Sequence, residues 1–380
     1  MRLARLTVRD FRNLARIDLD LPAEGMVVVG ENGHGKTNLL EAVYYLQLLR
    51  SARGARDADL VRFGAAAFHV AAESVSARTT HTVSAAFERA TKRKRVTLDA
   101  IERPRLSEAL GALPAVLCSP RDATVVAGSP SERRRFLDVA LALSSRPYLA
   151  ALQQYRGALV RRNAALRDGL RSSRDEARVA VWEPALAEHG ARIWRARVEW
   201  VERWRARFAE LCAAIGERGE AAMRYATSLE PSGTDEASVE RELARALESR
   251  RSHDLRRGMT SAGPHRDDLE LTLAEPHGPP RDLRAFGSAG QQRTAAIALR
   301  VLERETLRES RDASPLLLLD DPFAELDARR SSRILELLAG EGAAQIVLAV
   351  PRETDIPEGL TRLARWRVEH GALAPWTRAA

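Results

Sequence analysis

Apolar and polar positions near the start of the chain follow two different periods. Leu3–Val8 and Ile17–Leu21 alternate as half-buried β-strands do, and Met26–Val29 is a continuous apolar run that fits a buried strand. Asn38–Leu49 is apolar over the length of a helix. Beyond it, two more strand-like segments, 81–88 and 96–99, flank a basic turn. This part of the chain predicts a mixed α/β core with a β-rich lobe.

The pattern changes to almost continuous helix between about residues 130 and 257, where Ala, Arg, Leu and Glu dominate. Strand and helix signals return with Leu269–Leu273, Ala295–Leu307 and Leu316–Leu319. We therefore expect one discontinuous α/β domain, residues 1–129 with 258–380, and an inserted helical arm over 130–257. Within the arm, an aromatic stripe from Trp200 to Phe208 has helical spacing and predicts helix packing rather than base stacking.

The most specific chemical signal is the loop between the third predicted strand and the helix after it. Its pattern GxxxxGK[ST] is typical of a phosphate-binding loop, in which glycines let successive N–H groups point at phosphates. Lys36 would supply a cation to the β and γ groups, and Thr37 a hydroxyl to Mg²⁺. The predicted ATP-binding residues of this segment are Gly30, Glu31, Asn32, Gly33, His34, Gly35, Lys36, Thr37 and Asn38.

A second signal is the leucine run 316–319, which ends in two acidic residues. A buried strand of this kind can deliver carboxylates to a metal at its carboxyl end. Asp320 is the predicted Mg²⁺ partner, directly or through water, together with Thr37. Asp321 is predicted to polarise the attacking water, so Lys36, Asp320 and Asp321 form the candidate catalytic set.

A third signal is Ser288-Ala289-Gly290-Gln291-Gln292, which comes directly before a helix-like stretch. Serine and glycine there can present N–H groups and a hydroxyl to an anion, or they can form a plain helix cap. The order of the three signals resembles the ATP-binding cassette architecture. In that architecture the serine motif, here Ser288, Gly290 and Gln291, covers the γ-phosphate held by a partner subunit. The resemblance implies an ATP-dependent dimer whose interface is crossed by a turn at 324–327.

Several separate stretches carry a narrower resemblance. They are Asp10–Leu14, Lys36–Ala42, Ser119–Pro120, Gly128–Asp138, Gly263–Leu269, Gly290–Thr294 and Leu319–Asp327. Together they resemble the RecF family of recombinational repair ATPases, which are related to the heads of chromosome-maintenance ATPases. The resemblance implies an ABC-type ATPase core with an inserted helical domain. It also places Arg12 and Asn13 near the phosphates. An insert of about 130 residues fits a short helical lobe better than the long coiled coils of chromosome-maintenance proteins.

The family resemblance further implies a DNA partner. An ATP-dependent dimer would bind duplex DNA near a single-strand gap, help RecR and RecO to load the RecA recombinase, and reset through slow hydrolysis. The formal net charge of +8 agrees with a nucleic-acid partner. Residues 92–95 form a basic cluster that could contact phosphates or remain a solvated turn. The alternative function is a P-loop phosphotransferase, or a cassette ATPase that energises another machine.

Other features give narrower expectations. The segment Ile346–Pro351 has no hydroxyl or histidine that would sense the γ-phosphate, so no switch residue is assigned. His34 stands where the family commonly has glutamine, and as a loop side chain it is expected to face solvent. No apolar run is long enough to cross a bilayer and no signal-peptide core is evident, so a cytoplasmic protein without a membrane partner is expected. Cys118 and Cys212 lack metal-ligand spacing and are expected to be buried thiols.

Overall fold

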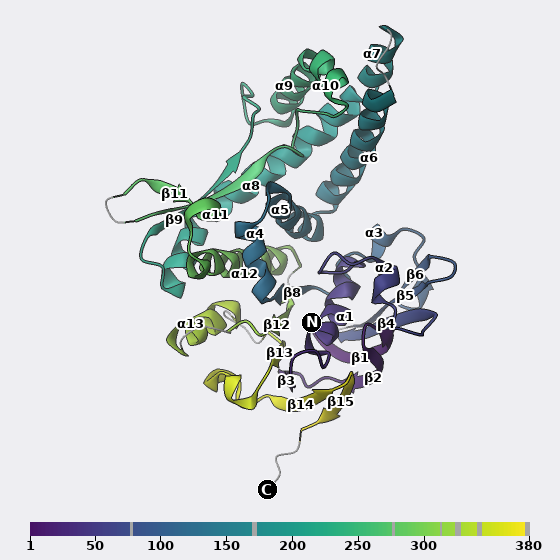
Figure 1. The fold of residues 1–380 in the computed structure, drawn as a ribbon, viewed down its shortest axis with the longest axis vertical. Helices are drawn as coiled ribbons and strands as arrows, with labels where there is room; N and C mark the ends of the chain where they lie inside the picture. Colours follow the sequence, from purple (N-terminus) through teal and green to yellow (C-terminus); the bar gives the residue numbers. More distant parts are fainter. Residues whose placement is uncertain are drawn as a thin grey trace. The chain divides into compact units, whose positions relative to one another are not determined.

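The computed structural model describes residues 1–76, 79–168, 173–275, 278–311, 314–323, 328–339 and 344–376 (Figure 1). The chain forms two compact units. The first comprises residues 1–122 together with 297–380, and the second comprises residues 123–296. The amino- and carboxyl-terminal parts of the chain therefore belong to one unit.

The first sheet of the first unit is antiparallel, with the order β2-β1-β4-β5-β6-β7. Alternate residues along β4 and along the second half of β5 are buried, which is the pattern of a sheet with one face on the core. Its strands are β1 (Arg2–Phe11), β2 (Leu14–Asp20), β4 (Ala67–Val75), β5 (Thr80–Glu88), β6 (Arg93–Leu98) and β7 (Ile101–Glu102).

The second sheet of this unit has the order β15-β14-β3-β13-β12-β8 and is parallel except for β15. Every residue of β3, β12 and β13 is buried, as expected for parallel strands covered on both faces. Because β13 pairs with both β3 and β12, the ends of β3 and β12 lie at the same edge of the sheet. The strands are β3 (Gly25–Val29), β8 (Ala115–Cys118), β12 (Leu316–Asp320), β13 (Ile346–Val350), β14 (Ala364–Glu369) and β15 (Ala372–Pro375).

Helix α1 (Lys36–Leu48) contacts strands of both sheets, β12, β13 and β8 on one side and β1, β4 and β5 on the other. All but two of its residues are buried, which explains why its sequence is apolar on all faces. Its two buried charged side chains are Lys36, 6 % exposed, and Glu41, 1 % exposed. The other helices of this unit are α2 (Asp57–Leu60), α3 (Leu106–Ala109), α13 (Ala328–Ala339) and the 3₁₀ turns η1 (Pro120–Asp122), η2 (Glu353–Asp355) and η3 (Glu358–Leu360).

The second unit consists mainly of helices, with α8 in contact with α6 and α9 (Figure 1). Ile193, Trp200, Trp204, Phe208 and Leu211 of α8 are all buried, so the aromatic stripe packs inside the unit as expected. The helices are α4 (Ala123–Ala127), α5 (Pro130–Ser144), α6 (Arg146–Asp168), α7 (Ser173–Ala180), α8 (Glu183–Ile215), α9 (Glu236–Ser249), α10 (Arg251–Arg257) and α11 (Leu283–Phe286). Helix α12 (Ala289–Arg311) begins in this unit and ends in the first.

A three-stranded antiparallel sheet completes the second unit: β9 (Glu220–Ala226), β10 (Asp268–Ala274) and β11 (Pro280–Asp282), in the order β11-β10-β9. Strand β9 lies in the segment that the sequence predicts as almost all helix. Its short alternation buries Ala221, Met223 and Tyr225, and β10 pairs with it over its whole length. Residues 258–296, expected with the ATPase domain, belong to the second compact unit because β10 is held by β9 and by the Arg133–Asp268 ion pair.

Two smaller expectations can be compared with this fold. Among the described residues, no helix is both long and apolar enough to cross a membrane. Cys118 and Cys212 are buried free thiols, and burial raises the pKa of each, that of Cys212 to about 12. They are therefore unreactive core residues, as predicted.

Candidate nucleotide site

The loop between β3 and α1 has the backbone that its glycines allow. Gly33 and Gly35 have φ of 86° and 118°, in the left-handed region that side chains disfavour. A Cβ at Gly30 would lie 2.5 Å from the carbonyl oxygen of Val368, and one at Gly35 would lie 2.9 Å from Oδ1 of Asn13. Gly33 is thus needed for its backbone conformation, Gly30 for close packing, and Gly35 for both.

Lys36 begins α1, and its ammonium points back into the loop. Nζ donates to the carbonyl oxygen of Gly30 at 2.5 Å and to that of Glu31 at 3.0 Å. Burial lowers the pKa of Lys36, while the nearby carboxylates of Asp320 and Asp321 act in the opposite direction. The loop therefore encloses a cation at the place where a phosphate chain would need one.

Thr37 and Asp320 bring the two most distant parts of the predicted site together. The Thr37 hydroxyl donates to Oδ1 of Asp320 at 3.1 Å, although the residues are 283 positions apart. Burial raises the pKa of Asp320, and the Thr37 hydrogen bond and the Lys36 charge oppose that rise. A hydroxyl and a carboxylate are both hard oxygen ligands, so this pair fits a Mg²⁺ ion.

Asp321, the second acidic residue, follows β12 with a φ of 47°, an unusual conformation for a residue other than glycine. Its backbone N–H donates to the Ala349 carbonyl at 2.8 Å, which fixes the turn at the end of the strand. Such strain is typical of functional sites. Asp321 is thereby held at the same sheet edge as the loop.

These residues surround a cavity of about 330 Å³ in the first unit. This volume lies in the range of small-molecule sites, which is roughly 300–1,000 Å³. The residues that line it are Asn32, Gly33, Gly35, Lys36, Thr37, Asn38, Arg53, Pro120, Asp320 and Asp321. The structure thus gathers the predicted loop and acidic residues around one space. It adds Arg53, which the sequence analysis did not assign.

Arg53 belongs to a group of polar residues that we call the Glu41 cluster: Arg12, Asn38, Glu41, Ser51 and Arg53. Glu41 accepts hydrogen bonds from Nε of Arg53 at 2.9 Å, from Nε of Arg12 at 3.1 Å and from the Ser51 hydroxyl at 2.5 Å. Nη2 of Arg53 also donates to Oδ1 of Asn38 at 2.5 Å. A carboxylate inside an otherwise apolar helix was the sequence signal that could have pointed to these arginines, because buried charge requires partners.

Arg12 and Asn13 lie beside the loop in different ways. Arg12 is turned toward Glu41, with Nε at 3.1 Å from Oε2. Asn13 donates to the Gly33 carbonyl at 3.4 Å and accepts from Asn38 at 2.8 Å. Asn13 therefore supports the loop backbone, and Arg12 neutralises the buried carboxylate next to it.

Glu31 and His34 lie at the outer side of the loop. The His34 ring packs on that of His370, with ring centroids 4.7 Å apart. The His34 carbonyl accepts from Gly371 at 2.9 Å. His34, expected to face solvent, is thus held against the turn between β14 and β15, while the Glu31 carboxylate is 89 % exposed.

The serine motif starts α12 in the second unit. Oγ of Ser288 accepts from the Gln291 N–H at 3.2 Å, and Oε1 of Gln291 accepts from the Ser288 N–H at 2.9 Å. This reciprocal pair is a capping box, which satisfies two N–H groups at a helix start. Ser288 and Gly290 are exposed. The motif is therefore a preformed and accessible helix N-terminus, and the turn expected at 324–327 lies outside the described residues.

The basic cluster at 92–95 is divided between the turn and β6. Lys94 is bound within the fold: Nζ lies 2.7 Å from Oδ2 of Asp57 and 2.6 Å from the Leu49 carbonyl, and it also lies over the Tyr45 ring. Arg93 and Arg95 approach Glu102 on the neighbouring strand at 3.5 and 3.9 Å. Lys94 is thus a structural cation, whereas Lys92 is exposed at the turn.

Comparison with known proteins finds matches that extend over nearly the whole chain. A family model described as "RecF/RecN/SMC N terminal domain" matches residues 2–365. The DNA replication and repair protein RecF of Anaeromyxobacter dehalogenans (strain 2CP-C) is 38% identical over 382 residues, covering 99% of each chain. RecF of Lacticaseibacillus casei (strain BL23) is 32% identical and covers 94% of this chain and 99% of its own.

Solved structures give the same result for the fold. A structure of the recombination mediator protein RecF with ATPrS in the RecFOR pathway matches with a TM-score of 0.88 and 26% identity, covering 99% of this chain and 98% of its own. An Smc head domain bound to the C-winged helix domain of ScpA matches with a TM-score of 0.56 and 15% identity, covering 99% of this chain and 98% of its own. The second likeness concerns the fold alone.

Proposed function

Because the chain belongs to the RecF family of DNA replication and repair proteins, we propose that it is an ATP-dependent DNA-binding protein of recombinational repair. The observation that carries this proposal is the 3.1 Å contact between Thr37 and Asp320. It joins a phosphate loop to an acidic strand end around one cavity. ATP fits this site because the loop offers N–H groups and Lys36 to its phosphates.

The residues around the cavity have different roles in ATP hydrolysis. Lys36 binds the β- and γ-phosphates, and Thr37 and Asp320 are the residues that would hold Mg²⁺, which would neutralise charge on the phosphate oxygens. Asp321 orients a water and accepts its proton as the water oxygen bonds to the γ-phosphorus. The bond between that phosphorus and the β–γ bridging oxygen then breaks, leaving ADP and phosphate. Arg53 adds positive charge at the cavity, where the Glu41 cluster holds it.

In this proposal, ATP binding allows two chains to associate, and ATP hydrolysis determines how long the dimer lasts. The exposed Ser288 and Gly290 at the start of α12 are suited to cover the γ-phosphate bound by the loop of a second copy. Two nucleotides would then be enclosed between two chains, and hydrolysis would separate them. The capping box keeps this helix start formed before the partner arrives, which lowers the ordering cost of association.

The DNA substrate we propose is duplex next to a single-strand gap, where the dimer assists RecR and RecO in loading RecA. The relative of known structure belongs to the RecFOR pathway by name. The chain itself has a formal net charge of +8 and a pI near 10.1, which favours polyanionic partners.

DNA affinity tests this function against that of a metabolite phosphotransferase. We expect the affinity for a gapped duplex, measured by fluorescence anisotropy, to rise with Mg²⁺-ATP compared with Mg²⁺-ADP. It should also fall steeply with salt, because phosphate contacts release counterions. A protein whose DNA affinity is the same with ATP, ADP and no nucleotide would contradict the proposal.

A further inference from the structure

A second cavity, of about 540 Å³, lies in the second unit. It is lined by Arg250, Arg257 and Arg266, by the hydroxyl residues Thr227, Ser228 and Ser261, and by Ala226, Met259 and Asp268. Three guanidinium groups thus face one space together with a single carboxylate. That carboxylate is bound elsewhere, since Oδ2 of Asp268 lies 2.7 Å from Nη2 of Arg133.

Two of the three arginines are held by neutral groups. Nη1 of Arg250 donates to the Ser261 carbonyl at 3.3 Å, and Nη2 of Arg266 donates to the Thr260 carbonyl at 2.8 Å. A carbonyl oxygen orients a guanidinium without cancelling its charge. Arg257 is exposed, and no described residue pairs with it. The positive charge of this cavity is therefore oriented and largely uncompensated.

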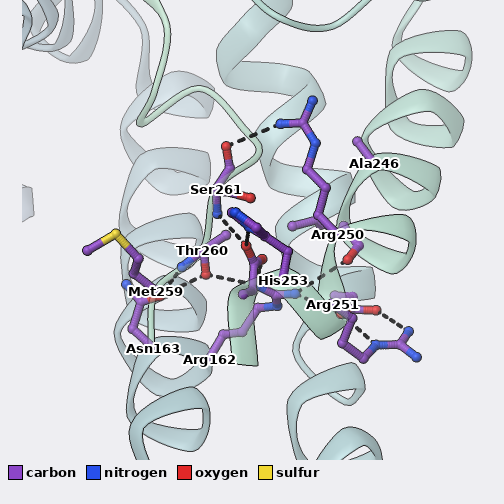
Figure 2. A network of polar contacts seen from close by, with 12 residues as sticks. Arg162, Asn163, Ala246, Arg250, Arg251, His253, Met259, Thr260 and Ser261 are labelled. Atoms are coloured by element: carbon purple, nitrogen blue, oxygen red, sulfur yellow. Dashed lines mark hydrogen bonds and ion pairs between the residues drawn. The ribbon is translucent and has the colours of Figure 1, made fainter. Parts of the chain in front are cut away.

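Thr260 and Ser261, whose carbonyls hold these two arginines, are fixed in place by a buried network of hydrogen bonds (Figure 2). Arg162 is fully buried and donates to Asp254 at 2.7 Å and to the Thr260 hydroxyl at 2.9 Å. Asp254 in turn accepts from the Ser261 N–H at 3.1 Å, and Asn163 accepts from the Thr260 N–H at 2.8 Å. Such backing holds the cavity wall rigid, as a preorganised binding site requires.

Ser261 supplies a further observation. Its hydroxyl is a buried polar atom with no hydrogen-bond partner among the described residues. An unsatisfied buried hydroxyl is costly, and it lies beside the three arginines that line the same cavity. An oxyanion in the cavity could accept a hydrogen bond from it.

We propose that this cavity is a binding site for phosphate groups, in which Arg250, Arg257 and Arg266 hold the oxygens and Ser261 donates its hydroxyl. Arginine forks match phosphate geometry, and hydroxyl groups complete such sites. The phosphate is supplied either by a nucleic-acid backbone or by a free phosphorylated ligand. The possibility that a nucleic-acid backbone supplies the phosphate rests on the proposed DNA-binding function. The possibility of a free phosphorylated ligand does not.

Arg257→Glu tests the site, and Arg256→Glu is its matched control. Both residues are exposed neighbours in α10, both variants change the charge equally, and only Arg257 lines the cavity. The first arm measures gapped-duplex affinity with Mg²⁺-ATP across a salt series. The second arm titrates inorganic pyrophosphate calorimetrically into Lys36→Ala protein with and without each charge reversal, because Lys36→Ala weakens the competing site at the phosphate loop.

If backbone phosphates occupy the cavity, Arg257→Glu weakens both ligands roughly tenfold or more, as expected for a lost charge-assisted contact. The salt slope for DNA then falls by about one, while Arg256→Glu changes little. If a free ligand is the source, only pyrophosphate binding weakens. Equal effects of the two reversals in both arms would overturn the site. Wild-type protein that fails to bind DNA would overturn the proposed function instead, and the pyrophosphate arm would still decide the cavity.

Discussion

Replacement of Glu41 by glutamine tests whether the Glu41 cluster supports the nucleotide site. Glu41 is 1 % exposed and bridges Arg12 and Arg53. Burial by itself raises the pKa of Glu41, but the hydrogen bonds from Arg53, Ser51 and Arg12 leave it below its usual value. The group is thus a charged carboxylate in the fold. Glutamine keeps the shape but removes the charge and turns one acceptor into a donor that faces a guanidinium.

The cost can be worked out from these contacts. Removing one partner of a buried ion pair destabilises a protein by about 3–5 kcal/mol. Arg12 and Arg53 are partly exposed, with side chains 21% and 25% accessible, so water can partly solvate them. We therefore expect a loss near the lower value, about 3 kcal/mol. Arg53 also lines the nucleotide cavity, so its release should weaken ATP binding as well.

Urea unfolding followed by circular dichroism measures the stability change, and a fluorescent ATP analogue reports binding. Glu24→Gln is the control: it is the same substitution in the same unit, but Glu24 is 66% exposed and 3.8 Å from Arg362. That change should stay within about 0.5 kcal/mol. If Glu41→Gln costs no more than Glu24→Gln and leaves ATP affinity unchanged, the cluster does not have the role assigned to it.

Three further predictions concern single residues. Lys36→Ala should lower ATP affinity at least tenfold in equilibrium titration, through lost charge-assisted contacts, with little loss of stability because its present partners are neutral carbonyls. Asp320→Asn should abolish Mg²⁺-dependent ATP hydrolysis while ATP binding changes less; equal loss of both would point to structural collapse. Burial raises the pKa of Asp267 to about 6, so its ionisation opposes folding as pH rises from about 4 to 6. Asp267→Asn should therefore gain stability relative to wild type by about 3 kcal/mol at pH 7 and by little at pH 4, and a pH-independent difference in urea unfolding would contradict the assignment.

The elements with strong local patterns were predictable from sequence. The ABC-type ATPase fold is confirmed, and the loop, its helix and the leucine strand lie where the periodicity placed them. Strand β9 was missed because its alternation is short and flanked by long helices, and its partner β10 is more than forty residues away in the chain. Local signals cannot report such long-range pairing.

Candidate site residues could be proposed from the sequence where chemistry constrains their spacing. The loop residues were found from glycine and lysine positions alone, whereas Arg53 follows no motif and reaches the cavity only through Glu41 and Asn38. The same limit applies to the second cavity, whose arginines come from the junction between α9 and α10, from α10 and from the segment before β10. Only the fold brings these arginines next to Thr227 and Ser228, which follow β9.

Molar mass measured by light scattering tests the central claim, which is that ATP induces a dimer in which Ser288 of one copy covers the γ-phosphate bound by the other. The comparison uses Mg²⁺-ATP and Mg²⁺-ADP with wild type, Ser288→Arg and the control Ser249→Arg, which adds the same exposed side chain to α9. We predict dimers with ATP for wild type and Ser249→Arg, and monomers for Ser288→Arg with ATP binding retained. A Ser288→Arg protein that still dimerises fully with ATP, or a wild type that stays monomeric, would contradict the account.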